Sequence, residues 1–149
     1  MKYEVYTFTV DASRQMFEFD SIGSLGCIRK KIAFGPTERP LVFNLAFGDV
    51  TENNEIDDFS VSNNGDRNKI LATVVSVIDR YTVFYPDRWI YIKGSTIERT
   101  RLYRMVISIH LEELTEKFEI YGESESNNDF SQFYKDMKVI AFLIKRKIT

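Results

Sequence analysis

The chain has 149 residues, of which 44% are hydrophobic and 14% aromatic, so it can bury a core as one globular domain over residues 1–149. Its formal net charge is -2 and its pI about 5.5, which disfavours a protein that holds nucleic acid through a general positive field. One cysteine, Cys27, excludes an internal disulfide framework and a multi-cysteine zinc site.

The N-terminus lacks the features of a targeting segment. Residues 1–10 alternate charged and apolar side chains and contain no continuous apolar stretch like that of a signal peptide. No run in the chain approaches the length of a membrane span. We therefore expect a cytoplasmic protein that does not associate with membranes.

Strand patterns fill the first third of the chain. Residues 2–10 alternate β-branched and aromatic types, which predicts a strand, whereas residues 16–19 are open between a short strand and an irregular return. Residues 27–34 predict a strand in which Cys27 is buried and the basic residues form a solvated face. Residues 41–47 are apolar enough to be central in the sheet, paired antiparallel with the preceding strand. The basic residues are Arg29, Lys30 and Lys31.

Residues 49–64 are the most polar stretch of the chain and carry acids without a base. Carboxylates can hold hard cations, but their spacing here does not match an EF-hand loop. We interpret the stretch as a solvated acidic loop with a short strand at residues 56–61, and we predict no metal ligand. The acids are Asp49, Glu52, Glu55, Asp57 and Asp58.

A helix and a strand follow this loop. Between Asn68 and Tyr81 the apolar residues recur every three or four positions, which predicts an amphipathic helix. Asp66 or Asn68 can cap its start, and Pro86 marks its end. Residues 89–93 then predict a strand that returns to the same sheet.

A second helix is predicted from Ser95 to about Leu114. Ser95 and Glu98 have the spacing of a capping box. Its apolar face is predicted to be Leu102, Met105, Val106 and Ile109, and its first turns carry Arg99, Arg101 and Arg104. The helix macrodipole disfavours cations at this end, so the arginines need carboxylate neighbours or an anion.

The last third returns to strands. Residues 118–121 predict a short strand ended by Gly122, followed by a polar loop at residues 123–129. Residues 139–144 predict a buried final strand, with residues 145–147 beyond it in solvent. The predicted fold is α+β, with a single mixed, mostly antiparallel sheet and two main helices.

This order of elements resembles the core of the GNAT acetyltransferase superfamily, over roughly residues 56–109. In that superfamily an R/Q-x-x-G-x-G/A turn binds the pyrophosphate of acetyl-CoA at a helix start. Here residues 62–67, Ser-Asn-Asn-Gly-Asp-Arg, occupy that place with one matching glycine, Gly65, and Asp66 adds a carboxylate beside it. Leu102-Tyr103 resembles the superfamily's L-Y pair, whose tyrosine is a general acid near the CoA sulfur.

The resemblance implies an acyl-CoA-dependent N-acyltransferase, or a degenerate relative that keeps a CoA/phosphate pocket between the helix starts at residues 65–68 and 95–99. Tyr103 would be catalytic, and the general base would be Asp57, Asp58 or a water. Acetyl-CoA is the implied cofactor. The implied cofactor-binding residues are Asn64, Gly65, Asp66, Arg67, Asn68, Ser95, Thr96 and Arg99.

Each of these residues also has a structural interpretation. Tyr103 fits the edge of a core, and Gly65 fits a left-handed turn residue after Asn64. The arginines of the second helix can pair with surface acids, and His110 has no partner motif near it. Enzymatic activity is therefore left open.

The segments SNNGDRNKILATV and GSTIERTRLYR also resemble small uncharacterised proteins of Bacteroidetes bacteria, grouped as a domain of unknown function, which imply no activity. The alternative to catalysis is a non-catalytic protein-interaction module, such as a partner subunit or a toxin-antitoxin component. Six acids and no base between Asp49 and Asp66 would then complement the arginines of the second helix. A protein partner or a homodimer is open, while RNA contact through residues 29–31 and 145–147 is disfavoured by the acidic balance.

Overall fold

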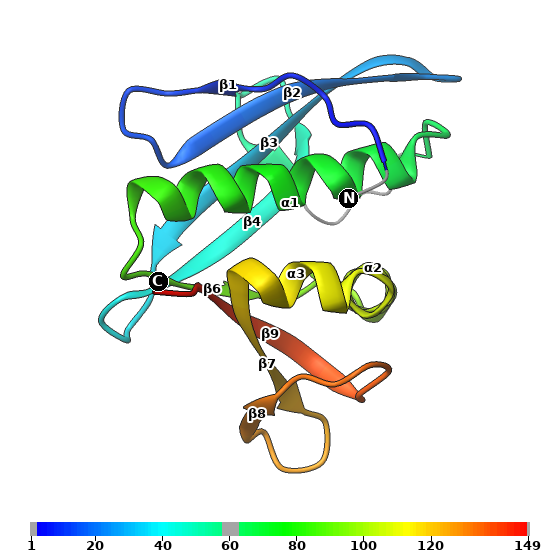
Figure 1. Ribbon diagram of the computed structural model, residues 1–149. Coiled ribbons are helices and arrows are strands. Elements are labelled where there is room, and N and C mark those ends of the chain that lie inside the picture. Colours follow the sequence, from blue (N-terminus) through cyan, green and yellow to red (C-terminus); the bar gives the residue numbers. More distant parts are fainter. Residues whose placement is uncertain (1–2, 58–62, 149) are drawn as a thin grey trace. The chain divides into compact units, whose positions relative to one another are not determined.

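The computed structural model describes residues 3–57 and 63–148 (Figure 1). The chain forms two compact units. Unit 1 comprises Met1–Gly35 and Leu45–Phe84, and unit 2 comprises Pro36–Asn44 and Tyr85–Thr149. Each unit is built from segments that are not continuous in sequence.

Unit 1 packs antiparallel strands against one long helix (Figure 1). Alternate residues of its second strand face the helix, and Phe17 and Phe19 are buried there. The rings of Phe34 and Tyr81 stack with centroids 3.7 Å apart and join the strands to the helix. The elements are β1 (Thr9–Val10), β2 (Met16–Gly23), β3 (Gly26–Pro36), β4 (Val42–Val50, whose first three residues belong to unit 2), β5 (Ile56–Asp57) and α1 (Arg67–Phe84).

Several predictions in unit 1 are wrong. The N-terminal strand is confined to Thr9–Val10, because Tyr6 donates its backbone N–H to Thr73 of α1 instead of to a strand. Cys27 is exposed, since it lies next to the turn between β2 and β3. Lys30 and Lys31 are buried rather than solvated. The predicted strand at residues 56–61 is observed as β5, and its remaining residues lie outside the described part of the chain.

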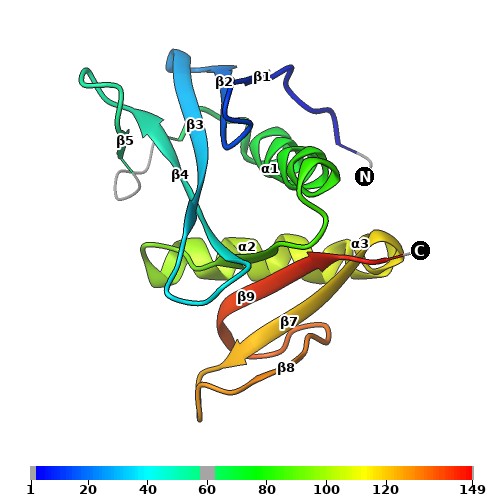
Figure 2. The same ribbon diagram turned by 90° about the vertical axis from the view of Figure 1, so that its left-hand side faces the viewer.

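Unit 2 is a sheet with two helices on one side (Figure 2). Val42–Asn44 of β4 pair in parallel with Trp89–Tyr91, and the other pairings within the unit are antiparallel. The elements are β6 (Trp89–Ile92), α2 (Ile97–Ile109), α3 (Leu111–Lys117), β7 (Phe118–Ser124), β8 (Phe130–Gln132) and β9 (Val139–Arg146). Alternate residues of β6 and β7 are buried, as expected for strands covered on one side. In β9 the alternation shifts at Ala141 and Phe142, which are both buried.

The predicted second helix is in fact two helices. Helix α2 ends at Ile109 and α3 begins at Leu111, so residues 3–57 and 63–148 form three helices where two main helices were predicted. The N-cap of α2 is Thr96, not Ser95, because the Thr96 hydroxyl accepts the N–H of Arg99 at 3.2 Å. The predicted apolar face is also wrong in part: Ile109 is 60% exposed, whereas Ile107 is buried.

The strands near the C-terminus are longer than the sequence predicts. Strand β7 continues past Gly122 to Ser124, since Gly122 pairs with Phe142 within the ladder. Strand β9 continues to Arg146 because Lys145 and Arg146 pair with the start of β7.

The hydrogen-bonded strand order is β1-β2-β3-β4-β6-β9-β7-β8, with β5 paired to β4. The fold is therefore α+β with one mixed, mostly antiparallel sheet, as predicted, while the GNAT-like order stays a prediction. Strand β4 contributes residues to both units. Within the described ranges, no helix combines the length and the apolar character needed to cross a membrane.

Candidate functional site

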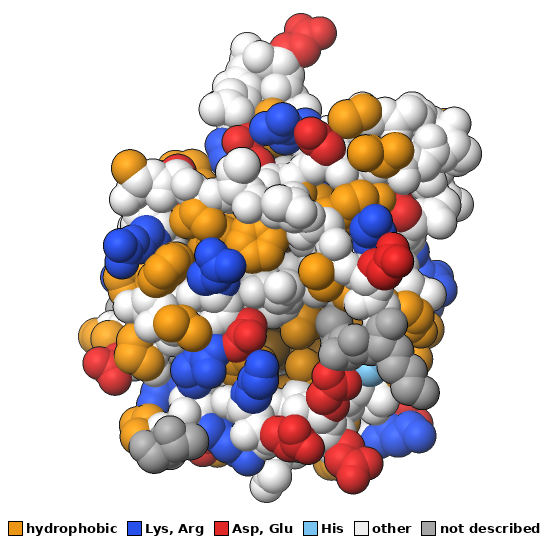
Figure 3. Space-filling model, turned by 45° about the horizontal axis from the view of Figure 1, so that its top comes forward, with side chains coloured by type: hydrophobic (Ala, Val, Ile, Leu, Met, Phe, Trp, Pro, Cys, Tyr) orange, Lys and Arg blue, Asp and Glu red, His pale blue; other side chains and the backbone are white. Residues whose placement is uncertain are grey.

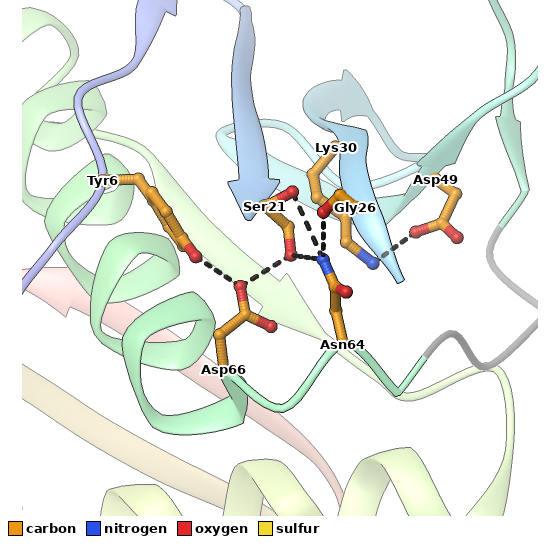
Figure 4. A network of polar contacts seen from close by, with 7 residues as sticks. All are labelled: Tyr6, Ser21, Gly26, Lys30, Asp49, Asn64 and Asp66. Atoms are coloured by element: carbon orange, nitrogen blue, oxygen red, sulfur yellow. Dashed lines mark hydrogen bonds and ion pairs between the residues drawn. The ribbon is translucent and has the colours of Figure 1, made fainter. Parts of the chain in front are cut away.

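The turn that leads into α1 is held by polar side chains of unit 1 (Figure 4). Asn64 is only 2% exposed. Its Nδ2 donates to the carbonyl and the hydroxyl of Ser21 at 3.3 and 3.0 Å, and to the carbonyl of Gly26 at 3.0 Å. Its Oδ1 accepts the backbone N–H of Leu25 at 2.6 Å. Asn64 thereby ties the start of α1 to the β2–β3 turn.

The carboxylate of Asp66 faces the same cluster. Its Oδ2 accepts the hydroxyl of Tyr6 at 2.5 Å and that of Ser21 at 2.6 Å (Figure 4). Its Oδ1 is buried and has no hydrogen-bond partner among the described residues. A carboxylate in this position repels an anion.

Tyr6 connects this cluster to the N-terminal segment. Its ring stacks on Phe19 with centroids 5.6 Å apart, and the Nζ of Lys69 lies 4.2 Å from the ring centroid. Figure 3 shows Lys and Arg side chains next to hydrophobic ones on one face of the molecule. Burial, and then the hydrogen bond to Asp66, raise the pKa of the Tyr6 hydroxyl above its ordinary value of 10.0.

A buried ion pair lies near this cluster. Lys30 of β3 is 5% exposed and forms a salt bridge with Asp49 of β4 (Figure 4). Register pairs Lys30 with Phe19, which places the lysine on the helix-facing side of the strands. The neighbouring Lys31 donates to the carbonyl of Asn54 at 3.2 Å. The prediction of a solvated acidic loop is therefore wrong for Asp49, which compensates a buried charge.

The predicted cofactor-binding turn is partly occupied by these structural contacts. Asn64 and Asp66 bond to groups of the protein itself, while Arg67 and Asn68 are exposed in the first turn of α1. Gly65 has a φ of +81°, so the turn explains this glycine without a ligand. All five residues belong to unit 1.

The other predicted residues lie at the start of α2 in unit 2. Thr96 caps the helix, and Ser95, Arg99 and Tyr103 are half-buried. Because the two groups belong to different units, the pocket predicted between the helix starts stays a prediction. So does the catalytic role of Tyr103.

Sequence reasoning missed Tyr6, Ser21 and Lys30. Tyr6 and Ser21 are separated from Asp66 by 60 and 45 residues, and no local pattern indicates contacts over such distances. One indirect signal was present in the sequence: Arg29, Lys30 and Lys31 lie within a strand pattern, and acids without a neighbouring base follow at residues 49–64.

Unit 2 presents a second feature, on the side of its sheet that α2 and α3 leave open. This surface, here called the aromatic face, consists of Trp89, Tyr91, Tyr121, Leu143 and Lys145. Register places Tyr91, Leu143 and Tyr121 side by side on three neighbouring strands. All five side chains are half-buried, whereas Ile90 and Ile92, which alternate with the aromatic residues of β6, are buried on the other side.

The aromatic face contains one perturbed hydroxyl. Tyr91 donates to Glu123 at 2.9 Å. Burial, and then this carboxylate, raise the pKa of Tyr91 to about 12, although Arg39 opposes the shift. Tyr91 is therefore a neutral, fixed donor at physiological pH.

Within the described ranges, no group of three or more His, Cys, Asp or Glu residues could hold a metal ion. Residues 2–147 match the model of a family of unknown function, DUF6934, and the chain belongs to this family. Membership of an uncharacterised domain family is thus confirmed, while a Bacteroidetes origin and a relation to the GNAT superfamily stay predictions. No curated protein and no solved structure matches the chain.

Proposed function

We propose that this protein is a non-catalytic protein-interaction module that binds a partner through the aromatic face. The proposal is carried by the half-exposed pair Trp89 and Tyr121, whose ring centroids lie 5.7 Å apart. Trp and Tyr are enriched where proteins bind one another, because their rings bury a large area while their N–H and O–H groups find polar partners.

The start of α1 supports this choice over an acyltransferase. A CoA pyrophosphate needs free backbone amides and a positive environment at a helix start. Here Asp66 places a carboxylate at that start. The side chain of Asn64 is hydrogen-bonded to β2 and the β2–β3 turn. The side chains of this turn thus make contacts that stabilise the fold, and the carboxylate of Asp66 opposes the binding of a phosphate.

The interaction surface differs from the one that charge alone predicts. The sequence suggests that the acids between Asp49 and Asp66 complement the arginines of α2. Asp49 is already paired with Lys30, and Asp66 with two hydroxyls. These two carboxylates therefore already take part in contacts within unit 1.

The test compares partner recovery from the native host by the wild-type chain and by Trp89→Ser/Tyr121→Ser. We expect cross-linked partners to be recovered by the wild type and by the control Tyr134→Ser, which changes a 64% exposed tyrosine outside the aromatic face. The double variant should lose them. Equal recovery by all three proteins would contradict the proposal.

Thermal melting in the presence of acetyl-CoA and of CoA tests the acyltransferase hypothesis. We expect no shift from either compound. A ligand at a hundred times its dissociation constant stabilises by about 2.7 kcal/mol, so a shift of that size would instead support the acyltransferase.

A further inference from the structure

We propose that the aromatic face binds a proline-rich segment of the partner in the polyproline II conformation. This inference rests on the proposed function and names the chemistry of the partner. It is carried by unused donors, apolar rings and balanced charge on one side of the unit 2 sheet.

The first observation is a pair of unused hydrogen-bond donors. The indole N–H of Trp89 and the hydroxyl of Tyr121 make no hydrogen bond with any residue in ranges 3–57 and 63–148. A polyproline II segment has no internal hydrogen bonds, so its carbonyls need external donors. The two side chains supply such donors on adjoining rings.

The second observation is the arrangement of the rings. The planes of Trp89 and Tyr121 are inclined by 57°, and Leu143 lies beside Tyr121 in the register of β7 and β9. Prolyl rings are compact and apolar, and aromatic surfaces in other peptide-binding domains hold them in this way. The preformed conformation of the peptide also limits the entropy lost on binding.

The third observation is the charge around the rings. Lys145 lies 5.7 Å from the Trp89 ring and pairs in register with Glu119. Arg39 acts on Tyr91, whose hydroxyl is bonded to Glu123. At this face the basic groups Lys145 and Arg39 are thus accompanied by the carboxylates of Glu119 and Glu123. This balance fits an uncharged peptide better than a polyanion, which would require a net positive surface.

The sole tryptophan of the chain, Trp89, makes a direct test possible. Its fluorescence in the chain of residues 1–149 is followed during titration with decaproline, with a glycine-serine peptide of equal length, and with an oligothymidylate. We expect a saturable change with decaproline only, nearly independent of salt.

Variants locate the site. Tyr121→Phe keeps the ring and removes one donor, so it should weaken decaproline binding about tenfold. The control Tyr134→Phe should bind like the wild type. Circular dichroism checks that each variant is folded. Equal affinity for decaproline in both variants would contradict the assigned donor.

The remaining outcomes separate this inference from the proposed function. No response to decaproline, together with partner recovery that still depends on the aromatic face, would overturn the polyproline inference alone. If decaproline does not bind and partner recovery does not depend on the aromatic face, the polyproline inference and the proposed function are both overturned. Salt-sensitive binding of oligothymidylate without decaproline binding would replace the peptide by a single-stranded nucleic acid.

Discussion

The side-chain amide of Asn64 forms hydrogen bonds with three backbone groups and one hydroxyl. Buried amides are stable only when such groups are paired, so the cost of removing Asn64 exceeds that of one ordinary hydrogen bond. The role of this residue is to position the β2–β3 turn.

We predict that Asn64→Ala lowers the free energy of unfolding by about 2–4 kcal/mol, since it leaves several buried groups unpaired. Urea denaturation measures the change. The matched control is Asn68→Ala, which alters an exposed asparagine four residues later and should stay within about 0.5 kcal/mol of the wild type. A small effect at both positions would show that the turn holds without Asn64.

Tyr6 should make the free energy of unfolding depend on pH in the alkaline range. Its pKa is above 10.0 in the folded protein and near 10.0 in the unfolded chain. The folded state therefore retains the proton longer, and the contribution is fully present below pH 10 and is lost as pH rises through the folded pKa.

We expect Tyr6→Phe to show a shallower loss of stability above pH 10 than the wild type, measured by urea unfolding at a series of pH values. Some loss should persist in this variant, because Tyr91 titrates at about 12 and acts in the same direction. Parallel curves for the two proteins would rule out Tyr6 as a source of the dependence.

At the scale of elements, the contact between β2 and the start of α1 is close. A Cβ on Gly23 would lie 1.8 Å from the carbonyl oxygen of Asn64, whereas a Cβ on Gly35 meets nothing within 4 Å. The backbone itself, not a flexible side chain, limits the space at Gly23.

This difference makes two glycines a matched pair. Gly23→Ala should destabilise the protein by several kcal/mol or prevent folding, because the turn must move away from Asn64. Gly35→Ala should be close to neutral. Thermal melting of both variants measures the difference, and equal melting temperatures would refute the close approach.

Elements with a clear period were predictable from the sequence. Helix α1 and strand β6 follow directly from the spacing of their apolar residues, and both were observed close to their predicted bounds. The break between α2 and α3 at His110 was not predictable from the period. The N-cap of α2 was not predictable either, because the hydroxyl of Ser95 or of Thr96 can cap a helix and tertiary packing decides between them. The burial of Lys30 could not be predicted either, since it depends on a strand register that places the lysine opposite Phe19.

At the scale of the molecule, β4 links the two units. Val42–Asn44 pair with β6 in unit 2, and the rest of the strand belongs to unit 1. We expect this shared strand to couple the unfolding of the two units, because each unit contains part of its hydrogen-bonded ladder.

We predict a single calorimetric unfolding transition whose calorimetric and van't Hoff enthalpies agree. This result would support the prediction of one domain over residues 1–149. Two resolved transitions would show instead that the units unfold independently. The isolated fragment 85–149 serves as a comparison and should fail to fold, since it lacks the parallel neighbour of β6.

The shared strand also sets an order of events during synthesis. Val42–Asn44 leave the ribosome long before their partners Trp89–Tyr91, and the strands beyond β6 come later still. Unit 1 can therefore begin to fold while the backbone groups of Val42–Asn44 still lack their partners in β6. The nascent chain is most exposed to wrong pairing in this interval, and a chaperone that binds extended apolar segments would act on it then.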